Sequence, residues 1–374
     1  MNTLSYADFS SKVHAKSLNK RIPLDATLEL TYRCNNKCVH CYCNLPENDK
    51  QAMKDELTTE EIKKLLDDLA SMGSLWLLIT GGEPLLRPDF EEIYLYAKKK
   101  GFLITLFSNG TLINENIIKF LSGYPPFYME ITLYGATKET YEKVTRVKGS
   151  YENCIRGISK IIDAGIKLRL KTMALTINQH EIEAMDRMAR EMRCEFRFDP
   201  MINKRLDNNT YSDPVAYRIS PEETVRLDIR FPQRIKEFKE FCERMVYAPV
   251  KSDRLVNCGA VGSCMQISPD GMVLPCSMLI KMGISLRERS LKDIWEVHFQ
   301  KIIDLKRNIH LKCDHCTLEN LCGQCAGWSL VEYGEVEREV QYLCDIAQKR
   351  AEVFPFLNDN IGGHDERKER MVEA

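Results

Sequence analysis

The sequence predicts an α/β fold with a parallel sheet, followed by a second, cysteine-rich unit. Two observations carry this prediction. Between residues 26 and 199, six short β-like runs alternate with amphipathic helical segments, which is typical of a parallel sheet with right-handed crossovers. In addition, the chain holds 15 cysteines, of which three lie within residues 34–41 and eight within 258–344. The periodicity leaves open whether the sheet stays open or curls into a barrel.

The predicted strands are short runs of mostly apolar and β-branched residues. The run WLLIT at 76–80, for example, is almost wholly apolar. The six strands are expected at residues 26–32, 76–80, 103–108, 128–133, 166–175 and 194–198.

Three helices between these strands have clear start signals and buried stripes. Thr58 and Glu61 form a capping box that begins a helix over 58–73. Residues 88–101 form a second helix, and Asn178 is expected to cap a third that runs to residue 193. The residues expected to face the core are Ile62, Leu65, Leu66, Leu69, Met72, Phe90, Ile93, Tyr94, Ala97, Ile182, Met185, Met188 and Met192.

Shifts in composition divide the chain. We expect an N-terminal extension (1–25), the α/β core (26–200), a helical linker (201–257), the cysteine-rich domain (258–350) and a flexible tail (351–374). The cysteine-rich domain has little apolar periodicity, so bound metal is expected to hold it together.

Charge and hydropathy exclude two classes of partner. Lys plus Arg number 53 against 54 Asp plus Glu, for a net charge of −1, whereas a nucleic-acid binder needs an excess of cations. Neither a signal peptide nor an apolar run of about 20 residues is present, so we expect no membrane span and a cytoplasmic protein. In that reducing compartment, clustered cysteines are metal ligands more often than disulfides.

The first cysteine group has the spacing C-x3-C-x2-C. Cys34, Cys38 and Cys41 follow the first predicted strand directly, and thiolates suit iron–sulfur clusters or zinc. Three thiolates on a four-iron cluster leave one iron open for a substrate or cosubstrate. On spacing alone, a zinc loop completed by His40 or Cys43 remains an alternative.

A Gly-Gly pair follows the second predicted strand. Gly81 and Gly82 leave backbone groups accessible to a polar ligand, and Pro84 stiffens the exit. The pair alone is weak evidence, but together with a cysteine loop one β–α unit earlier it indicates a cofactor site.

CNNKCVHC at 34–41 and GGEP at 81–84 resemble the radical S-adenosylmethionine (SAM) superfamily. The resemblance covers residues 26 to 200 and implies a partial (β/α)6 TIM-like barrel. It implies a [4Fe-4S] cluster on the three cysteines, whose open iron binds SAM, and a 5′-deoxyadenosyl radical that abstracts hydrogen from a substrate. It also implies a reductant of the flavodoxin or ferredoxin type. The SAM contacts that it implies are His40, Tyr42, Gly81, Gly82, Glu83, Pro84, Ser108, Asn109, Thr132 and Arg146.

The second cysteine group is similar to the SPASM extension of many radical SAM enzymes, which carries auxiliary four-iron clusters. This chain departs from that pattern at one internal spacing, Cys322-x2-Cys325 in place of C-x3-C. Paired C-x2-C segments alone would also suit structural zinc. By resemblance, one auxiliary cluster takes Cys258, Cys264, Cys276 and Cys325, and the other takes Cys313, Cys316, Cys322 and Cys344.

The resemblance implies a ribosomally made peptide or protein side chain as substrate. Ser277 stands where sulfatase-maturing relatives have Asp, which argues against that activity. Only 33 residues precede Cys34, so a leader peptide would need a separate binding protein. A radical SAM oxidoreductase acting on a small molecule is the alternative, and a non-catalytic zinc scaffold is a distant one. Tyr134 and Asp199, at strand ends, are weak candidates for proton carriers.

Overall fold

A computed structural model describes residues 6–18, 20–207, 209–245 and 253–354. The chain divides into two compact units, Met1–Arg218 with Cys258–Asp304, and Ile219–Asn257 with Leu305–Ala374. The predicted cysteine-rich domain at 258–350 therefore does not coincide with one unit. Its first part belongs to the first unit because it adds strands to the sheet there.

The first unit is built on a nine-stranded sheet with the order β11-β10-β9-β1-β4-β5-β6-β7-β8. Strands β1, β4, β5, β6, β7 and β8 pair in parallel, which confirms the six predicted strands. β9 extends the sheet by pairing in parallel with β1, and β10 and β11 follow antiparallel. The strands span Asp25–Glu29 (β1), Trp76–Thr80 (β4), Leu103–Ser108 (β5), Tyr128–Thr132 (β6), Leu168–Met173 (β7), Glu195–Asp199 (β8), Cys264–Ile267 (β9), Met272–Leu274 (β10) and Ile284–Ser285 (β11).

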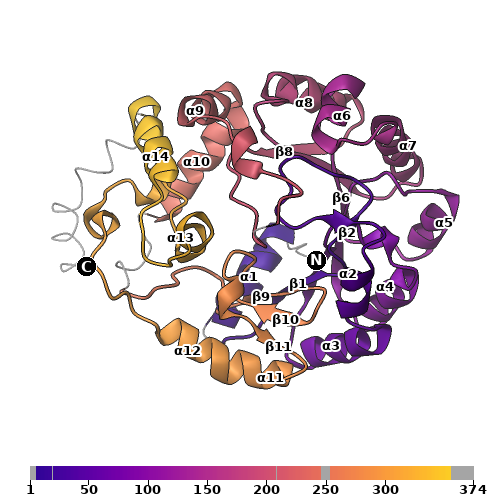
Figure 1. The fold of residues 1–374 in the computed structure, drawn as a ribbon, viewed down its shortest axis with the longest axis horizontal. Helices are drawn as coiled ribbons and strands as arrows, with labels where there is room; N and C mark the ends of the chain where they lie inside the picture. The colour runs from indigo at the N-terminus through magenta and orange to yellow at the C-terminus, as the bar shows by residue number, and fades with distance from the viewer. Residues whose placement is uncertain (1–5, 19, 208, 246–252, 355–374) are drawn as a thin grey trace, which may run out of the picture. The chain divides into compact units, whose positions relative to one another are not determined.

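Helices α3 to α8 run as an arc outside these strands (Figure 1). They span Thr59–Ser71 (α3), Phe90–Lys99 (α4), Glu115–Gly123 (α5), Lys138–Thr145 (α6), Ser150–Asp163 (α7) and Ile182–Glu191 (α8). The predicted capping box of α3 is present, and Ile62 and Leu65 are buried as expected. Asn178 stands at the N-cap of the 3-10 turn that leads into α8, as predicted, but its side chain forms no capping hydrogen bond. Its side chain accepts from Leu175 N (2.8 Å) and donates to Tyr134 O (3.0 Å), so it joins two strand exits instead.

The sheet has two different faces, because side chains alternate along each strand. Leu77, Ile79 and Leu170 are at most 1% exposed and face the helices. Glu130 and Lys171 lie on the opposite, inner face. Helices on the outside of six parallel strands make this a partial (β/α)6 barrel.

The N-terminal extension contains a helix, α1 (Tyr6–Leu18). His14 Nε2 lies 2.8 Å from Asp25 Oδ2, and the His14 ring stacks on Trp76 with centroids 4.8 Å apart. Trp76 Nε1 also donates to the Tyr6 hydroxyl at 2.8 Å. Because Asp25 and Trp76 begin β1 and β4, α1 lies at the amino ends of these strands.

Short elements connect the sheet to the cysteine-bearing segments. They are β2 (Arg33–Cys34), β3 (Leu45–Pro46), α2 (Lys50–Asp55), and the 3-10 turns Pro84–Leu86, Gln179–Glu181, Pro214–Tyr217 and Ile280–Met282. The first unit ends with α11 (Leu291–Asp293), a π turn (Ile294–His298) and α12 (Phe299–Asp304).

The second unit is helical. It contains α9 (Pro221–Arg230), α10 (Pro232–Met245), 3-10 turns at Lys312–His315 and Glu319–Leu321, α13 (Ala326–Tyr333) and α14 (Gln341–Val353). Its core includes Asp228, which is fully buried and paired with Arg234 (2.6 Å) and Arg350 (2.8 Å). The predicted tail begins inside α14, and residues 355–374 lie outside the described residues. None of the helices described is long and apolar enough to cross a membrane.

Candidate active site at the carboxyl ends of the strands

The three clustered cysteines lie in a loop that follows β1. We call residues 34–41 the cysteine loop. Its backbone is fastened to the end of α6, since Lys37 N donates to Thr145 O (2.9 Å) and Val39 N donates to Val144 O (3.0 Å). The loop is therefore held at the carboxyl end of the sheet, where active sites of parallel α/β folds are built.

The thiols of this loop lie close to one another. Cys34 and Cys38 are buried, and burial together with the neighbouring Cys41 raises the pKa of Cys38 to about 12. Burial, followed by Cys38 and Glu83, raises the pKa of Cys34. A hydrogen bond from Cys43 lowers the pKa of Cys41 to about 7. Metal loading must therefore release protons from Cys34 and Cys38.

Two side chains in the loop have buried polar atoms without a partner. Among the described residues, Asn36 Nδ2 and Oδ1 and His40 Nδ1 are buried and form no hydrogen bond. Buried polar atoms are normally paired, so these atoms indicate that the loop is shaped around a bound group. Three thiols in one loop are the donor type that a thiolate-ligated cofactor needs, although no three side chains of the described residues stand as a preformed metal site.

Gly81 and Gly82 pack directly against the entry to the cysteine loop. A Cβ on Gly81 would lie 2.3 Å from Thr31 O, and one on Gly82 would lie 2.3 Å from Arg33 O. Gly82 N donates to Thr31 O (2.7 Å), and Glu83 N donates to Arg33 O (2.9 Å). The two glycines thus allow their own backbone to contact the backbone of residues 31–33. This packing role is additional to the predicted role of leaving backbone groups accessible to a ligand.

Gly82→Ala is expected to lower SAM cleavage by at least about 100-fold, because the new Cβ would displace Arg33 and the adjoining Cys34. The rate of 5′-deoxyadenosine formation under dithionite measures this. Gly123→Ala is the matched control, since a Cβ there meets nothing within 4 Å. A wild-type rate in Gly82→Ala would show that this packing does not position the loop.

Glu83 is fully buried and bound by its own chain. Its carboxylate accepts from Asn109 N (2.8 Å), Ser108 Oγ (3.0 Å) and Leu85 N (3.1 Å). Burial raises its pKa to about 7. Asn109 Nδ2 donates in turn to Asn35 Oδ1 (2.8 Å). Three predicted contact residues, Glu83, Ser108 and Asn109, are thereby brought together and joined to the cysteine loop, and Pro84 starts the 3-10 turn that follows.

The aromatic candidates lie on two sides of the loop. The His40 ring meets Tyr134 edge-on with centroids 5.1 Å apart, and the Tyr134 hydroxyl forms a hydrogen bond with the Cys38 thiol. Tyr42 is exposed, and its hydroxyl lies 3.5 Å from Glu29 Oε1. Burial raises the pKa of Glu29 to about 7, and sequence reasoning missed this carboxyl because strand position alone does not single it out.

The other predicted residues are more dispersed. Arg146 follows the two α6 residues that bind the loop, with a left-handed φ of 55°, and its Nη2 lies 3.4 Å from the Tyr217 hydroxyl. Thr132 ends β6 on the inner face. Asp199 is exposed at the end of the outermost strand β8 and lies 3.3 Å from Arg197. The structure does not bring Asp199 to the cysteine loop.

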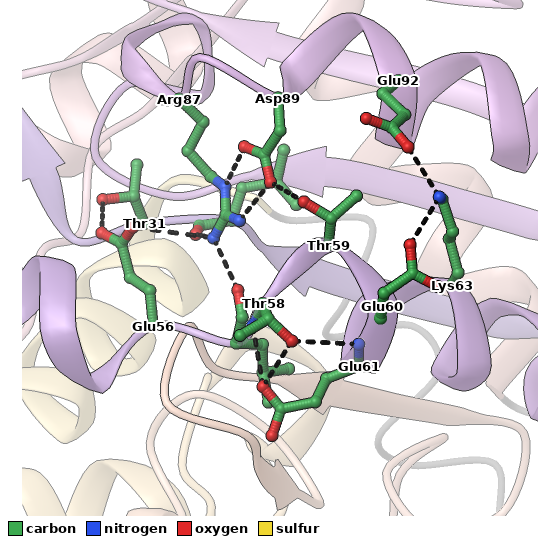
Figure 2. Close-up of polar contacts among 12 residues, drawn as sticks. Thr31, Glu56, Thr58, Thr59, Glu60, Glu61, Lys63, Arg87, Asp89 and Glu92 are labelled. Carbon is green, nitrogen blue, oxygen red and sulfur yellow. Dashed lines mark hydrogen bonds and ion pairs between the residues drawn. The ribbon is translucent and has the colours of Figure 1, made fainter.

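A buried ion-pair network beside the loop also escaped sequence analysis. Arg33, next to Cys34, donates from Nε to Glu56 Oε1 (2.8 Å), and the two side chains are only 6% and 8% exposed. Glu56 also accepts from the Thr31 hydroxyl and lies 3.6 Å from Arg87. Figure 2 shows Arg87 between Glu56 and Asp89, with an Arg87 Nη2–Asp89 distance of 2.6 Å.

Arg87 connects this network to the strand that leads into the loop. Its Nη1 donates to Leu30 O (3.2 Å) and Leu57 O (3.0 Å). A buried charge is costly unless it is paired and hydrogen-bonded. The hydrogen bonds that satisfy Arg87 therefore hold the backbone at the end of β1 and at Leu57 in fixed positions. The network therefore positions Cys34 through its neighbour Arg33.

The far end of the loop is held by a segment predicted to be linker. Ser212 Oγ donates to Cys41 O (2.5 Å), and Arg205 donates to Asn44 O (2.7 Å). Arg205 is 7% exposed and also pairs with Asp207. Residues 201–218 thus belong to the first unit and hold the exit of the cysteine loop.

The auxiliary cysteines are divided between the two units, with Cys258, Cys264 and Cys276 in the first and the other five in the second. In the first, Cys264 is partly buried, and burial followed by the charges of Cys258 and Cys276 raises its pKa to about 12. In the second, burial followed by three neighbouring thiols raises the pKa of Cys322 to about 11. Those three neighbours are Cys313, Cys316 and Cys344. Cys325, predicted as a ligand of the first auxiliary cluster, lies in the second unit and caps α13.

The chain matches two domain families. The radical SAM superfamily profile matches residues 28–191, and that of SPASM, an iron–sulfur cluster-binding domain, matches residues 258–326. Together these domains imply [4Fe-4S] clusters and SAM as cofactors, which agrees with the three thiols and the unpaired polar atoms of the cysteine loop.

Several characterised proteins are similar over most of the chain. The AdoMet-dependent heme synthase of Methanosarcina barkeri (strain Fusaro / DSM 804) is 28% identical, over 84% of this chain and 94% of that protein. AlbA, the antilisterial bacteriocin subtilosin biosynthesis protein of Bacillus subtilis (strain 168), is 28% identical over 81% of this chain and 67% of its own length. Both relatives are therefore similar in the core and beyond it.

A solved structure shares the fold. SuiB of Streptococcus suis, bound to S-adenosylmethionine, superimposes with a TM-score of 0.67 at 18% identity, over 92% of this chain and 84% of that one. SuiB has also been solved with its precursor peptide SuiA. The cysteine loop, the GGEP turn, the partial barrel and both family matches lead to one conclusion: this chain belongs to the radical SAM superfamily and carries a C-terminal SPASM domain.

Proposed function

We propose that the protein cleaves SAM reductively at the cysteine loop and uses the resulting radical to abstract hydrogen from a side chain of a ribosomally made peptide. The observation that carries this proposal is the buried loop itself. It gathers three thiols with the unpaired atoms of Asn36 and His40 at the carboxyl end of a partial barrel.

Cys34, Cys38 and Cys41 would hold the cluster. When bound, a three-thiolate [4Fe-4S] cluster supplies one electron that cleaves a C–S bond of SAM, releasing methionine and a 5′-deoxyadenosyl radical. The chain's own residues hold the loop from three sides, through Gly82, Arg33 and Ser212. They exclude water from Cys34 and Cys38, which are at most 9% exposed.

The two auxiliary clusters would take the ligand sets predicted above. A flavodoxin- or ferredoxin-type donor would supply the electron, and a separate protein would present the leader of a peptide substrate. With dithionite as the reductant, SAM cleavage can be measured without the protein donor, the leader-binding protein or the auxiliary clusters.

A peptide substrate is supported by AlbA, whose name places it in bacteriocin biosynthesis. The inner face supports it as well, because it carries as many carboxylates as cations along β6 to β8. These side chains are Glu130, Glu195 and Asp199, and Arg169, Lys171 and Arg197. A mixed surface suits a peptide better than a substrate with several carboxylates, which would need an excess of cations.

A tetrapyrrole is the second candidate substrate. It is favoured by the heme synthase of Methanosarcina barkeri, since this chain covers 94% of that protein. Tetrapyrroles such as Fe-coproporphyrin III carry several carboxylates, so this candidate conflicts with the balanced charge of the inner face.

The test is anaerobic incubation of the iron-loaded protein with SAM and dithionite. We expect 5′-deoxyadenosine and methionine in equal amounts, formed faster when the correct substrate is present. Candidate peptides deuterated at side-chain carbons should transfer deuterium to 5′-deoxyadenosine. Acceleration by Fe-coproporphyrin III alone would establish the second candidate, and no 5′-deoxyadenosine at all would refute the proposed chemistry.

A further inference from the structure

The charged side chains on the inner face of β6, β7 and β8, which support a peptide substrate by their balance, also form a defined arrangement around one lysine. The register places Thr132 beside Lys171 and Lys171 beside Arg197. This row includes the end of β6, so it lies at the carboxyl side of the sheet, the same side as the cysteine loop. Lys171 is 21% exposed and Arg197 42%, so both side chains are partly open to solvent.

Glu130 is the buried centre of this group. Its carboxylate is 3% exposed and accepts from Arg197 Nη2 (2.7 Å) and Nε (3.0 Å), a bidentate pair. Lys171 Nζ lies 3.2 Å from Glu130 Oε1, the oxygen that also accepts from Arg197 Nη2. Burial alone would favour protonation of Glu130, but hydrogen bonds from Arg197 and the charge of Lys171 lower its pKa below the ordinary value.

The other carboxylates of the group are already paired with the two arginines. Arg197 Nη1 lies 3.3 Å from Asp199, and Arg169 Nη2 lies 2.6 Å from Glu195. Within the described residues, no carboxylate other than Glu130 lies within ion-pair distance of Lys171. The six side chains balance in charge, and Lys171 has as its carboxylate partner Glu130, which it shares with Arg197.

The ammonium of Lys171 is also fixed in place. Its Nζ lies over the Phe107 ring, 3.5 Å from the centroid, so an aromatic ring and a carboxylate hold it from two sides. Phe107 and Glu130 are register partners on β5 and β6. A positioned, partly exposed ammonium whose carboxylate partner is shared with an arginine is able to bind a further anion.

We propose that Lys171 is a specificity-determining residue that binds one carboxylate of the substrate on the inner face, with Glu130 and Phe107 positioning its ammonium. This proposal rests on the proposed function in one respect: the ligand bound by Lys171 is the substrate of the proposed reaction. The carboxylate comes either from an acidic peptide or from a tetrapyrrole side chain, and both offer the same chemistry.

Competitive acetylation of the iron-loaded protein tests this directly, without an activity readout. Trace acetic anhydride labels Lys171, and mass spectrometry compares it with Lys64, which is 76% exposed and serves as the internal reference. The probes are a pool of end-capped, lysine-free pentapeptides with a central glutamate, the same pool with glutamine, and Fe-coproporphyrin III.

Protection of Lys171 by at least fivefold with the glutamate pool, but not with the glutamine pool, supports an acidic peptide. Protection by the tetrapyrrole alone supports the same subsite and assigns the carboxylate to that source. Equal protection by both pools, or none by any probe, would overturn the proposal. SAM cleavage measured without any probe reports on the proposed function separately, since no substrate carboxylate takes part in it.

Variants give a second readout. Lys171→Met is expected to weaken binding of the protecting probe about tenfold, whereas Lys167→Met, at an exposed position just before the same strand, should leave it unchanged. Lys171→Arg should restore the binding. Unchanged affinity in Lys171→Met would also overturn the proposal.

The pH dependence distinguishes binding by an amine from a general packing effect. Burial and the charge of Arg197 lower the pKa of Lys171, whereas Glu130 and Asp199 raise it. The net result is a pKa of about 8. Probe affinity should therefore fall as pH rises above about 8, when the ammonium is lost. Lys171→Arg should remove this fall, because a guanidinium stays charged throughout that range.

Discussion

Cys34→Ala is expected to reduce SAM cleavage to below about one thousandth of the wild-type rate, because two thiolates no longer hold a cluster with one open iron. Bound iron should fall from about 12 to about 8 atoms per chain, since the auxiliary clusters keep their ligands. Anaerobic iron and sulfide analysis, together with 5′-deoxyadenosine formation, measures both effects.

Two controls separate this result from general damage. Cys194→Ser alters a half-buried thiol before β8 and should leave iron content and rate unchanged. Cys316→Ala should also lose about four irons, while SAM cleavage continues. If Cys34→Ala retained about 12 irons, or if zinc replaced iron in the wild-type protein, the cluster assignment would be wrong.

Glu56→Leu is expected to destabilise the protein by about 3–5 kcal/mol, because Arg33 would lose its carboxylate partner while it remains buried. Both side chains are less than 10% exposed, so water cannot replace the lost pairing. Urea unfolding of the metal-free protein under reducing conditions measures the loss. Arg87 should tolerate the change better, since it keeps Asp89 (2.6 Å).

The double variant Arg33→Met/Glu56→Leu sharpens the test. Apolar residues of similar volume often replace a buried pair at little cost, so the double variant should regain most of the stability that Glu56→Leu loses. Glu60→Gln is the surface control, because Glu60 is 81% exposed. Equal loss in the single and double variants would mean that packing, and not unpaired charge, explains the effect.

The strands and the better-patterned helices were predictable because their signals are local. Thr58 and Glu61 are three residues apart, and the stripe from Ile62 to Leu69 repeats with the helical period. Asn178 shows the limit of such reasoning. Its side chain could cap a helix or bind strand ends, and its distant partner, Tyr134, is brought to it only by the tertiary structure.

Interactions between distant residues were not predictable from the sequence. β9 pairs with β1 although more than 200 residues separate them, as Asp25 faces Cys264. Likewise, Arg33, Glu56 and Arg87 give no local sign that they meet. The charged residues of β6 to β8 resemble a solvated surface in sequence, and only the register shows that Glu130 and Lys171 share one face.

The cysteine loop and the inner face are fixed by different residues. Gly82, Arg33 and Ser212 hold the loop, whereas the charged group around Glu130 is built on β6 to β8. Substitutions at Lys171 or Phe107 can therefore be accumulated without weakening the supports of the loop. In laboratory evolution, the inner face is the place to randomise when a new substrate is wanted, and the loop is the part to leave untouched.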